Sequence, residues 1–192
     1  MQLEQKYLSY GFKEWAIAVS ALSAGQTIML LRKGGIRETS SQFRVTHHHV
    51  WLYPTYEHQK PRLLKTQYAH QVQEVSSGWH PQTVTIQSYA EITHTLTVDS
   101  WEIIQQLEPY HIWNQTMISD RFKWKPQQPL AILLLRVFNL PVPTAVPYHQ
   151  SYGGCKSWIE LQQPISLQNL TPVMTLDRYQ KQVREIVSII DS

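Results

Sequence analysis

The segment LLRKGGIRE (residues 30–38), together with THHHVWLYPTYEHQ (residues 46–59), holds the features around which the rest of the sequence is organised. An apolar run ends in two basic residues, and two consecutive glycines then permit the positive φ angles of a tight turn. A second run, 43–52, alternates between two faces and ends before Pro54. The segment therefore predicts two adjacent antiparallel strands, 27–32 and 43–52, connected through a basic turn.

Length and composition favour one globular domain without a membrane segment. The chain has 192 residues, of which 42% are hydrophobic and 16% are charged, so it can bury a substantial core as a single compact domain, 1–192. No apolar run reaches the roughly 18 residues of a membrane span. The first residues, MQLEQK, lack the basic and then apolar pattern of a signal peptide. We therefore expect a cytoplasmic protein.

The charge balance permits, without requiring, a nucleic acid or a nucleotide as partner. Seventeen basic residues against fourteen acidic ones give a net charge of +3, which an ordinary basic globular protein also carries. Seven Trp and ten Tyr add many aromatic side chains. Aromatic rings can stack on bases, but most of these rings are expected in the core.

Hydrophobic periodicity predicts both helices and strands. Apolar residues at helical spacing indicate helices, and runs that are apolar or alternate indicate strands, one of which bends near Ser88. The predicted helices are 12–24, 62–75, 99–107 and 178–190, and the predicted strands are 27–32, 43–52, 83–98, 130–140 and 155–161, with an irregular segment over 109–128. These elements predict an α+β fold, with flanking helices and either a mixed, largely antiparallel sheet or a partly closed barrel. Their order resembles that of PUA-like nucleic-acid-binding barrels, so a PUA-like barrel is what this analogy implies.

Two apolar strands resemble each other. TIMLLR (27–32) is similar to AILLLR (131–136), and each is followed by a strand that contains a tryptophan. Either the chain consists of two related halves, 10–75 and 79–165, followed by a C-terminal helix over 177–190, or apolar strands happen to be similar by chance.

Basic side chains on and after these strands are candidate ligands for a phosphate group. Arg32, Lys33 and Arg37 surround the two glycines, whose backbone N–H groups could converge on an anion together with the cations. Arg136 and Lys156 are candidates as well, and Arg136 would lie beside Arg32 if the two similar strands were neighbours. The alternative is an ordinary hairpin turn with solvated charges.

Arg136 also interrupts the most apolar run of the chain, LAILLLRVFNL. A charge in such a strand is costly unless it is paired. We expect Arg136 either to meet a carboxylate, such as Glu14, Glu38 or Glu160, or to mark a strand end that faces a ligand. The only cysteine, Cys155, excludes an intrachain disulfide and a Cys-rich zinc site, and we expect it to be a buried structural residue.

The histidines do not predict a metal site, and no cofactor is expected. His47 and His49 share one face of their predicted strand, and His48 lies on the other. A metal needs three or four convergent ligands, so a polar face of the sheet is the better interpretation. A site begun by His47 and His49 and completed by His58 or Glu57 is the alternative.

Glu38, Glu57 and His58 are the candidate catalytic groups, because a histidine held by a carboxylate can act as a general base. The alternative is that Glu57 and His58 cap a helix that begins near Pro61, where an acidic group is favourable. These groups and the basic turn with Arg32 would converge on one concave surface only if the loop after residue 54 folds back over the sheet.

Several short motifs resemble a bacterial, largely cyanobacterial family known as domain of unknown function 1802. The resemblance covers roughly residues 10–165. It is carried by EWA near Trp15, RKGGIRE, PTYEHQ, HIW at His111, RFKWKP at Arg121, LLLRV and GCKSW. Links between some members and restriction-type nuclease domains imply work near nucleic acid.

Three functions follow from these patterns, and whether the protein is an enzyme is left open. The first is binding of nucleic acid or a nucleotide through a basic and polar cleft, with Tyr53, Tyr56 or Trp113 as stacking faces. The second is a non-enzymatic module that docks a protein partner through an exposed aromatic patch. The third is a hydrolase or nuclease-like enzyme.

Overall fold

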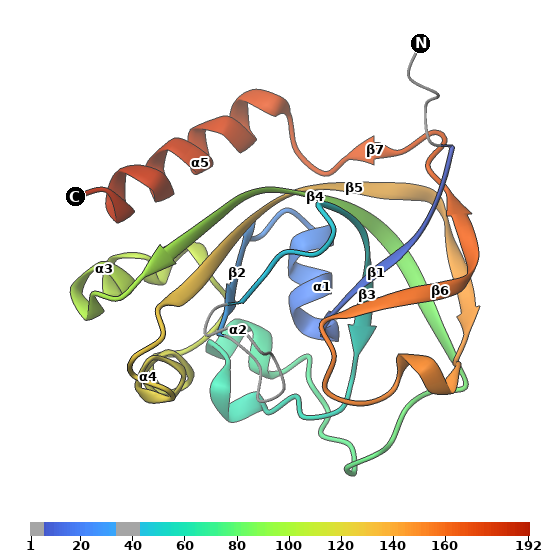
Figure 1. Cartoon of the computed structure of the whole chain (residues 1–192), viewed down its shortest axis with the longest axis horizontal. Coiled ribbons are helices and arrows are strands. Elements are labelled where there is room, and N and C mark those ends of the chain that lie inside the picture. The colour runs from blue at the N-terminus through green and yellow to red at the C-terminus, as the bar shows by residue number, and fades with distance from the viewer. Residues whose placement is uncertain (1–5, 34–42) are drawn as a thin grey trace.

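The structure is a computed structural model that describes residues 6–33 and 43–192 (Figure 1). Its strands are β1 (Tyr7–Trp15), β2 (Met29–Arg32), β3 (His49–Thr55), β4 (Thr83–Val98), β5 (Leu130–Pro147), β6 (Trp158–Ser166) and β7 (Thr171–Pro172). Its α-helices are α1 (Ala16–Ser23), α2 (Thr66–Ala69), α3 (Trp101–Gln106), α4 (Gln115–Lys123) and α5 (Leu176–Ile190). Single 3-10 turns cover Pro61–Leu63, Glu108–Tyr110 and Gln150–Tyr152.

Within the described residues, the strands form one mixed sheet in the order β2-β5-β4-β3-β1-β6, and β7 adds to β5. The β1–β3 pair is parallel, and the other pairs are antiparallel. The predicted α+β fold with a mixed, largely antiparallel sheet and flanking helices is therefore confirmed. In the same part of the chain, none of the helices is long and apolar enough to cross a membrane.

The two longest strands, β4 and β5, pair along most of their length and arch over α1 (Figure 1). The ladder shifts register between Ile86 and Ser88 and again between Ile92 and His94. Such bulges bend a strand, so the bend that the sequence predicts near Ser88 is confirmed. Ser88 is fully buried, and its hydroxyl bonds the hydroxyl of Ser23 and donates to Asn139 Oδ1 at 2.7 Å.

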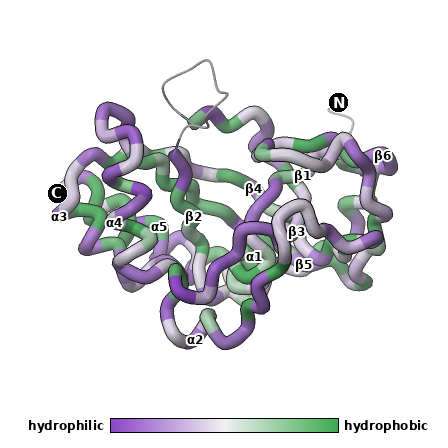
Figure 2. The backbone as a smooth tube through the Cα atoms, turned by 90° about the horizontal axis from the view of Figure 1, so that it is seen from below, coloured by the Kyte–Doolittle hydropathy of each residue, from purple (hydrophilic) through white to green (hydrophobic). Residues whose placement is uncertain are grey.

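The long strands take part in two hydrophobic clusters. The larger cluster lies around α1 and includes the apolar residues of β2 and the first part of β5. The smaller one lies among β1, β3, β6 and the far ends of β4 and β5, and Trp51 and Tyr152 are its largest fully buried side chains. Figure 2 shows hydrophobic stretches in the middle of the molecule around β2 and α1, and a largely hydrophilic segment around α2.

The helix predicted over 12–24 is wrong for residues 12–15, which form the end of β1. β1 lies between β3 and β6, so both edges of its backbone find hydrogen-bond partners there. Phe12 and Trp15 therefore belong to a strand, although their spacing also suits a helix. The predicted helix end is confirmed, because Gly25 has a φ of 67° and donates its N–H to Leu22 O at 3.0 Å.

Two other segments differ from the prediction. The helix predicted over 62–75 is reduced to a 3-10 turn and the single turn of α2. The segment 109–128, predicted to be irregular, contains α4, whose N-terminus is capped by the side chain of Asn114 through the N–H of Met117 at 3.0 Å. The C-terminal helix is confirmed, with Thr175 rather than Asp177 as its cap.

The predicted pairing of strand 27–32 with strand 43–52 is wrong. β2 pairs with β5, and β3 pairs with β1 and β4. The two similar strands are thus neighbours, but they run antiparallel, and Arg32 faces Ala131. Arg136 lies at the other end of this short ladder, beyond the Met29–Leu134 pair, so the two arginines are not side by side.

Candidate functional site

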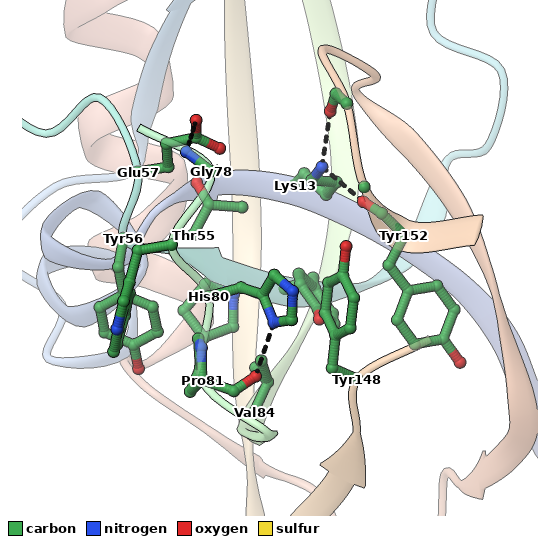
Figure 3. Close-up of a pocket in the computed structure, with 15 residues that line it drawn as sticks. Lys13, Thr55, Tyr56, Glu57, Gly78, His80, Pro81, Val84, Tyr148 and Tyr152 are labelled. Atoms are coloured by element: carbon green, nitrogen blue, oxygen red, sulfur yellow. Dashed lines mark hydrogen bonds between the residues drawn. The ribbon is translucent and has the colours of Figure 1, made fainter. Parts of the chain in front are cut away.

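A cavity of about 150 Å³ opens between the end of β3, the segment before β4 and the turn between β5 and β6 (Figure 3). We call it the aromatic pocket. Its lining consists of Lys13, Tyr53, Pro54, Thr55, Tyr56, Glu57, Gly78, Trp79, His80, Pro81, Val84, Tyr148, Tyr152, Gly153 and Gly154.

Aromatic rings form much of this lining. His80 and Tyr148 stack with their ring centroids 3.4 Å apart and their planes 13° from parallel. Tyr56 meets Trp79 edge to face at 6.0 Å, and Trp79 is 44% exposed. In Figure 3 the rings of Tyr56, His80, Tyr148 and Tyr152 lie in a row, with Glu57 and Lys13 above them. The wall of the pocket is therefore largely aromatic.

Lys13 brings a cation to the pocket from β1. Its ammonium donates to Tyr152 O at 2.6 Å and to Gly154 O at 2.8 Å. Burial lowers the pKa of Lys13, and the neighbouring Lys156 lowers it further, although Cys155 acts in the opposite direction. An ammonium has three N–H donors. Two of them bond the carbonyl oxygens of Tyr152 and Gly154, so the third can donate to a ligand.

Glu57 brings a carboxylate. Its Oε1 accepts the N–H of Gly78 at 2.6 Å and the hydroxyl of Ser77 at 3.2 Å, and His58 Nε2 lies 3.3 Å away. The Gly78 N–H is the main reason that the pKa of Glu57 is lowered. Among the described residues, no hydrogen bond occupies Oε2, so this oxygen is available to accept a proton donor of a ligand.

Tyr53 adds a polar atom to the pocket wall. Its hydroxyl is buried and has no hydrogen-bond partner among the described residues. Burial raises the pKa of Tyr53, so the hydroxyl stays protonated. An unsatisfied buried hydroxyl is costly, and a ligand that reached it would relieve that cost.

Arg32 and Lys33, two of the residues predicted to bind phosphate, are engaged within the protein. Arg32 pairs with Glu14 Oε2 at 3.0 Å, donates to Lys13 O at 2.6 Å and lies over the ring of Phe12. Lys33 is buried and donates to Phe122 O at 2.6 Å. Arg37 and Glu38 lie outside the described residues.

Those sequence-predicted residues that the structure describes do not lie on one surface. Side chains alternate along β1, so Glu14 turns toward Arg32 whereas Lys13 turns toward the aromatic pocket, where Glu57 also lies. His58, at a positive φ of 66°, is 61% exposed beside Glu57. Lys156 is close enough to Lys13 to influence its pKa, and it donates to Ser151 O at 2.8 Å.

Arg136 has no carboxylate within 4.0 Å among the described residues, so the predicted pairs with Glu14 and Glu160 are not formed there. Its guanidinium lies 4.9 Å from the centroid of the Phe138 ring. Cys155 is exposed rather than buried, because it follows Gly154 in an outer turn and not in a strand.

The three consecutive histidines contact three different partners. His47 stacks on Tyr10, His48 Nδ1 bonds Ile92 O at 3.1 Å, and His49 Nδ1 bonds the Tyr89 hydroxyl. Across residues 6–33 and 43–192, no group of three or more His, Cys, Asp and Glu side chains could hold a metal ion.

Tyr53, Tyr56 and Glu57 are candidate residues from the sequence that do line the aromatic pocket, but most of its lining is not predicted. Trp113, the third predicted stacking face, is buried and not part of it. The missed residues come from separate segments, and the available signals were WHP (79–81) and YHQSYGG (148–154), both aromatic and both rich in turn-forming residues.

Comparisons with known proteins give a family and two similar structures. Residues 11–185 match the model of the family described as domain of unknown function (DUF1802). No curated protein matches the chain. The crystal structure of a serine-to-alanine mutant of the ASCH protein from Zymomonas mobilis is similar, with 12% identity, a TM-score of 0.44 and coverage of 92% of this chain and 94% of that chain. A second crystal structure of ASCH from Zymomonas mobilis has 12% identity, a TM-score of 0.42 and coverage of 91% and 93%.

Proposed function

Because the chain belongs to the DUF1802 family, a domain of unknown function, we propose a function from the geometry of the aromatic pocket. The pocket binds the base of a nucleotide or an unpaired base of a nucleic acid. The observation that carries this proposal is a ring-sized cavity with aromatic walls, into which a lysine donor and a glutamate acceptor both reach.

The size of the pocket suits one ring. A cavity of about 150 Å³ is comparable with those that take up a benzene-sized molecule. Stacking of a base on an aromatic side chain contributes about 1–3 kcal/mol, and Trp79 is exposed enough to offer a face. Because the cavity admits a ring and not a base pair, the base must be outside a duplex.

The polar groups suit the edge of a base. Lys13 keeps one free N–H for a ring nitrogen or carbonyl, and Glu57 Oε2 can accept an amino or imino N–H. On its Watson–Crick edge, every unpaired base carries a hydrogen-bond donor beside an acceptor, so this arrangement favours bases over purely apolar rings.

The experiment compares two exposed tryptophans. Trp79 lines the pocket at 44% exposure, whereas Trp124, at 42%, does not line it. Calorimetry would measure the affinity for nucleoside monophosphates, for short single-stranded oligonucleotides and for the matching duplexes, all at low salt. Trp79→Ala should weaken binding to the single strand by about 5- to 150-fold, the equivalent of about 1–3 kcal/mol.

Trp124→Ala is the control and should change the affinity by less than about twofold. Duplexes should bind more weakly than single strands, because their bases are not free to enter the pocket. The proposal fails if no single-stranded ligand binds at low salt, or if both tryptophan variants weaken binding equally.

A further inference from the structure

A second cavity lies between α5 and the face of β4 and β5 on which that helix packs. It is an open groove of about 460 Å³, and its charged and titratable lining residues are Glu91, His94, Arg136, Tyr179 and Arg184. We call it the α5 groove. Figure 1 shows α5 on one side of the β4–β5 pair and α1 on the other. The α5 groove and the aromatic pocket have no lining residue in common.

Arg136 is an unpaired charge in this groove. It is half-buried in a strand whose neighbouring residues Leu135 and Val137 are buried. Its Nε is buried and has no hydrogen-bond partner among the described residues. Stacking on Phe138 holds the guanidinium in place. Although Glu91 is its cross-strand neighbour, no ion pair forms between them within 4.0 Å.

Arg184 adds a second guanidinium from the opposite wall, because it projects from α5 into the same groove. In the part of the chain that the structure describes, Arg184 has no ion pair either. With His94 neutral, the lining side chains still carry a net positive charge, because two arginines outnumber the single carboxylate of Glu91. Tyr179 does not change this balance, because its hydroxyl bonds Thr93 and burial raises its pKa.

The N-terminus of α5 contributes to the same field. Leu176, the first residue of this 15-residue helix, and Tyr179 both line the groove. The N-terminal end of a helix carries partial positive charge from its free N–H groups. Asp177 in the first turn of α5 offsets part of this charge, so Arg136 and Arg184 are the main positive groups that an anion in the groove would meet.

We propose that the α5 groove is a second binding site, and that it takes a phosphate group. Phosphate has enough oxygens to accept hydrogen bonds from guanidinium groups on two walls at once, which a carboxylate does less well. The groove is also larger than the aromatic pocket, at about 460 Å³ against about 150 Å³, so it has room for what the phosphate is attached to. The phosphate can be a free ion or part of a nucleic-acid backbone.

The test uses three arginine-to-glutamine variants that remove the same charge. Arg136→Gln and Arg184→Gln change the groove, whereas Arg178→Gln changes an exposed residue of α5 that does not line it. Binding of inorganic phosphate and of a short single-stranded oligonucleotide would be measured by calorimetry at low salt, with acetate as a control anion. Each groove variant should weaken phosphate binding by about tenfold, and Arg178→Gln by less than about twofold.

The two ligands distinguish the source of the phosphate. Weaker binding of both ligands supports a site for phosphate itself, and weaker binding of the oligonucleotide alone supports a site for backbone phosphates. Equal losses in all three variants, no loss in any, or equal binding of acetate would overturn the proposal. Arg184 is exposed on a helix surface, so its variant carries the test even if Arg136→Gln folds poorly. Inorganic phosphate has no ring to stack, so this arm does not depend on base binding in the aromatic pocket.

Discussion

Lys13 and Glu14 are consecutive residues of β1, yet their side chains serve opposite faces of the strand. Lys13 donates to two carbonyl oxygens beside the aromatic pocket, whereas Glu14 pairs with Arg32 on the side of the larger hydrophobic cluster. Because successive side chains alternate along a strand, ligand binding and stability should be separable at these two positions.

Glu14→Gln should lower the free energy of unfolding and leave base binding intact. Glu14 is buried, and Arg32 is only 17% exposed, so losing the carboxylate leaves a largely buried arginine without its partner. Breaking such a pair typically costs about 3–5 kcal/mol. Denaturant unfolding would measure this loss. An affinity for single strands that falls by more than about threefold would contradict the separation.

Lys13→Met should mainly weaken base binding and should cost less stability than Glu14→Gln. The variant loses the free N–H that faces the pocket, so affinity for a base should fall by about tenfold. The loss of its two hydrogen bonds to the 152–154 turn should cost about 1–3 kcal/mol of stability. Calorimetry and unfolding on the same sample measure both. Unchanged affinity would remove Lys13 from the site.

Base affinity should fall at alkaline pH before ordinary lysines titrate. Burial lowers the pKa of Lys13 from its usual value of 10.5, so the ammonium loses its proton earlier as the pH rises. Wild type should show a fall in affinity on raising the pH from neutral, and Lys13→Met should not. A fall of the same size in both proteins would show that another group is responsible.

Gly153→Ala should disturb the pocket through Tyr148. A Cβ at this position would come 2.8 Å from the Tyr148 hydroxyl and 3.3 Å from Gln150 O. Tyr148 would have to move, and with it the ring stack on His80, so affinity should fall by about fivefold. The double variant Gly153→Ala/Tyr148→Phe removes the clashing hydroxyl and should recover affinity. No recovery would show that the backbone, and not Tyr148, is affected.

His111 should make stability depend on pH between 6.5 and about 4. Burial lowers the pKa of His111 from 6.5 to about 4, so the folded protein holds the neutral ring. Its contribution is complete above pH 6.5 and is lost as the pH falls toward 4, because the unfolded chain binds the proton first. The loss should reach about 3 kcal/mol. Unfolding of wild type and His111→Phe across this range measures it, and identical slopes would contradict it.

The sequence predicts best those elements whose hydrophobic pattern directly reflects which of their faces are buried. The first part of β5, Leu130–Leu135, is a continuous apolar run, β4 alternates on either side of its bulges, and α5 has one apolar stripe. These patterns indicate a buried strand, a half-buried strand and a helix that packs by one face. The last residues of β1, 12–15, have an apolar spacing that also suits the helix predicted over 12–24, and only the pairing of β1 with β3 and β6 decides for a strand.

Long-range pairing is what the sequence does not show. β2 has apolar residues that suit any neighbour, and its choice of β5 over β3 depends on the whole sheet. The aromatic pocket is not predicted for the same reason. Lys13, Trp79 and Tyr148 lie together only because β1, β4 and β5 converge at one end of the sheet. Glu57 is predictable because it lies in a polar cluster of the sequence. Its hydrogen-bond partner Gly78 is 21 residues away in the sequence, and no local pattern connects the two.

The position of β5 in the sheet has a consequence for synthesis on the ribosome. β5 is the hydrogen-bonded neighbour of both β2 and β4, and Ala131, the partner of Arg32, is translated 99 residues (131 − 32) after it. Because synthesis proceeds at about 5–20 residues per second, about 5–20 s pass between the translation of β2 and that of its partner. During this interval the apolar strand Met29–Leu31 lacks its native partner, so the β2 edge of the sheet can form only after β5 has been made.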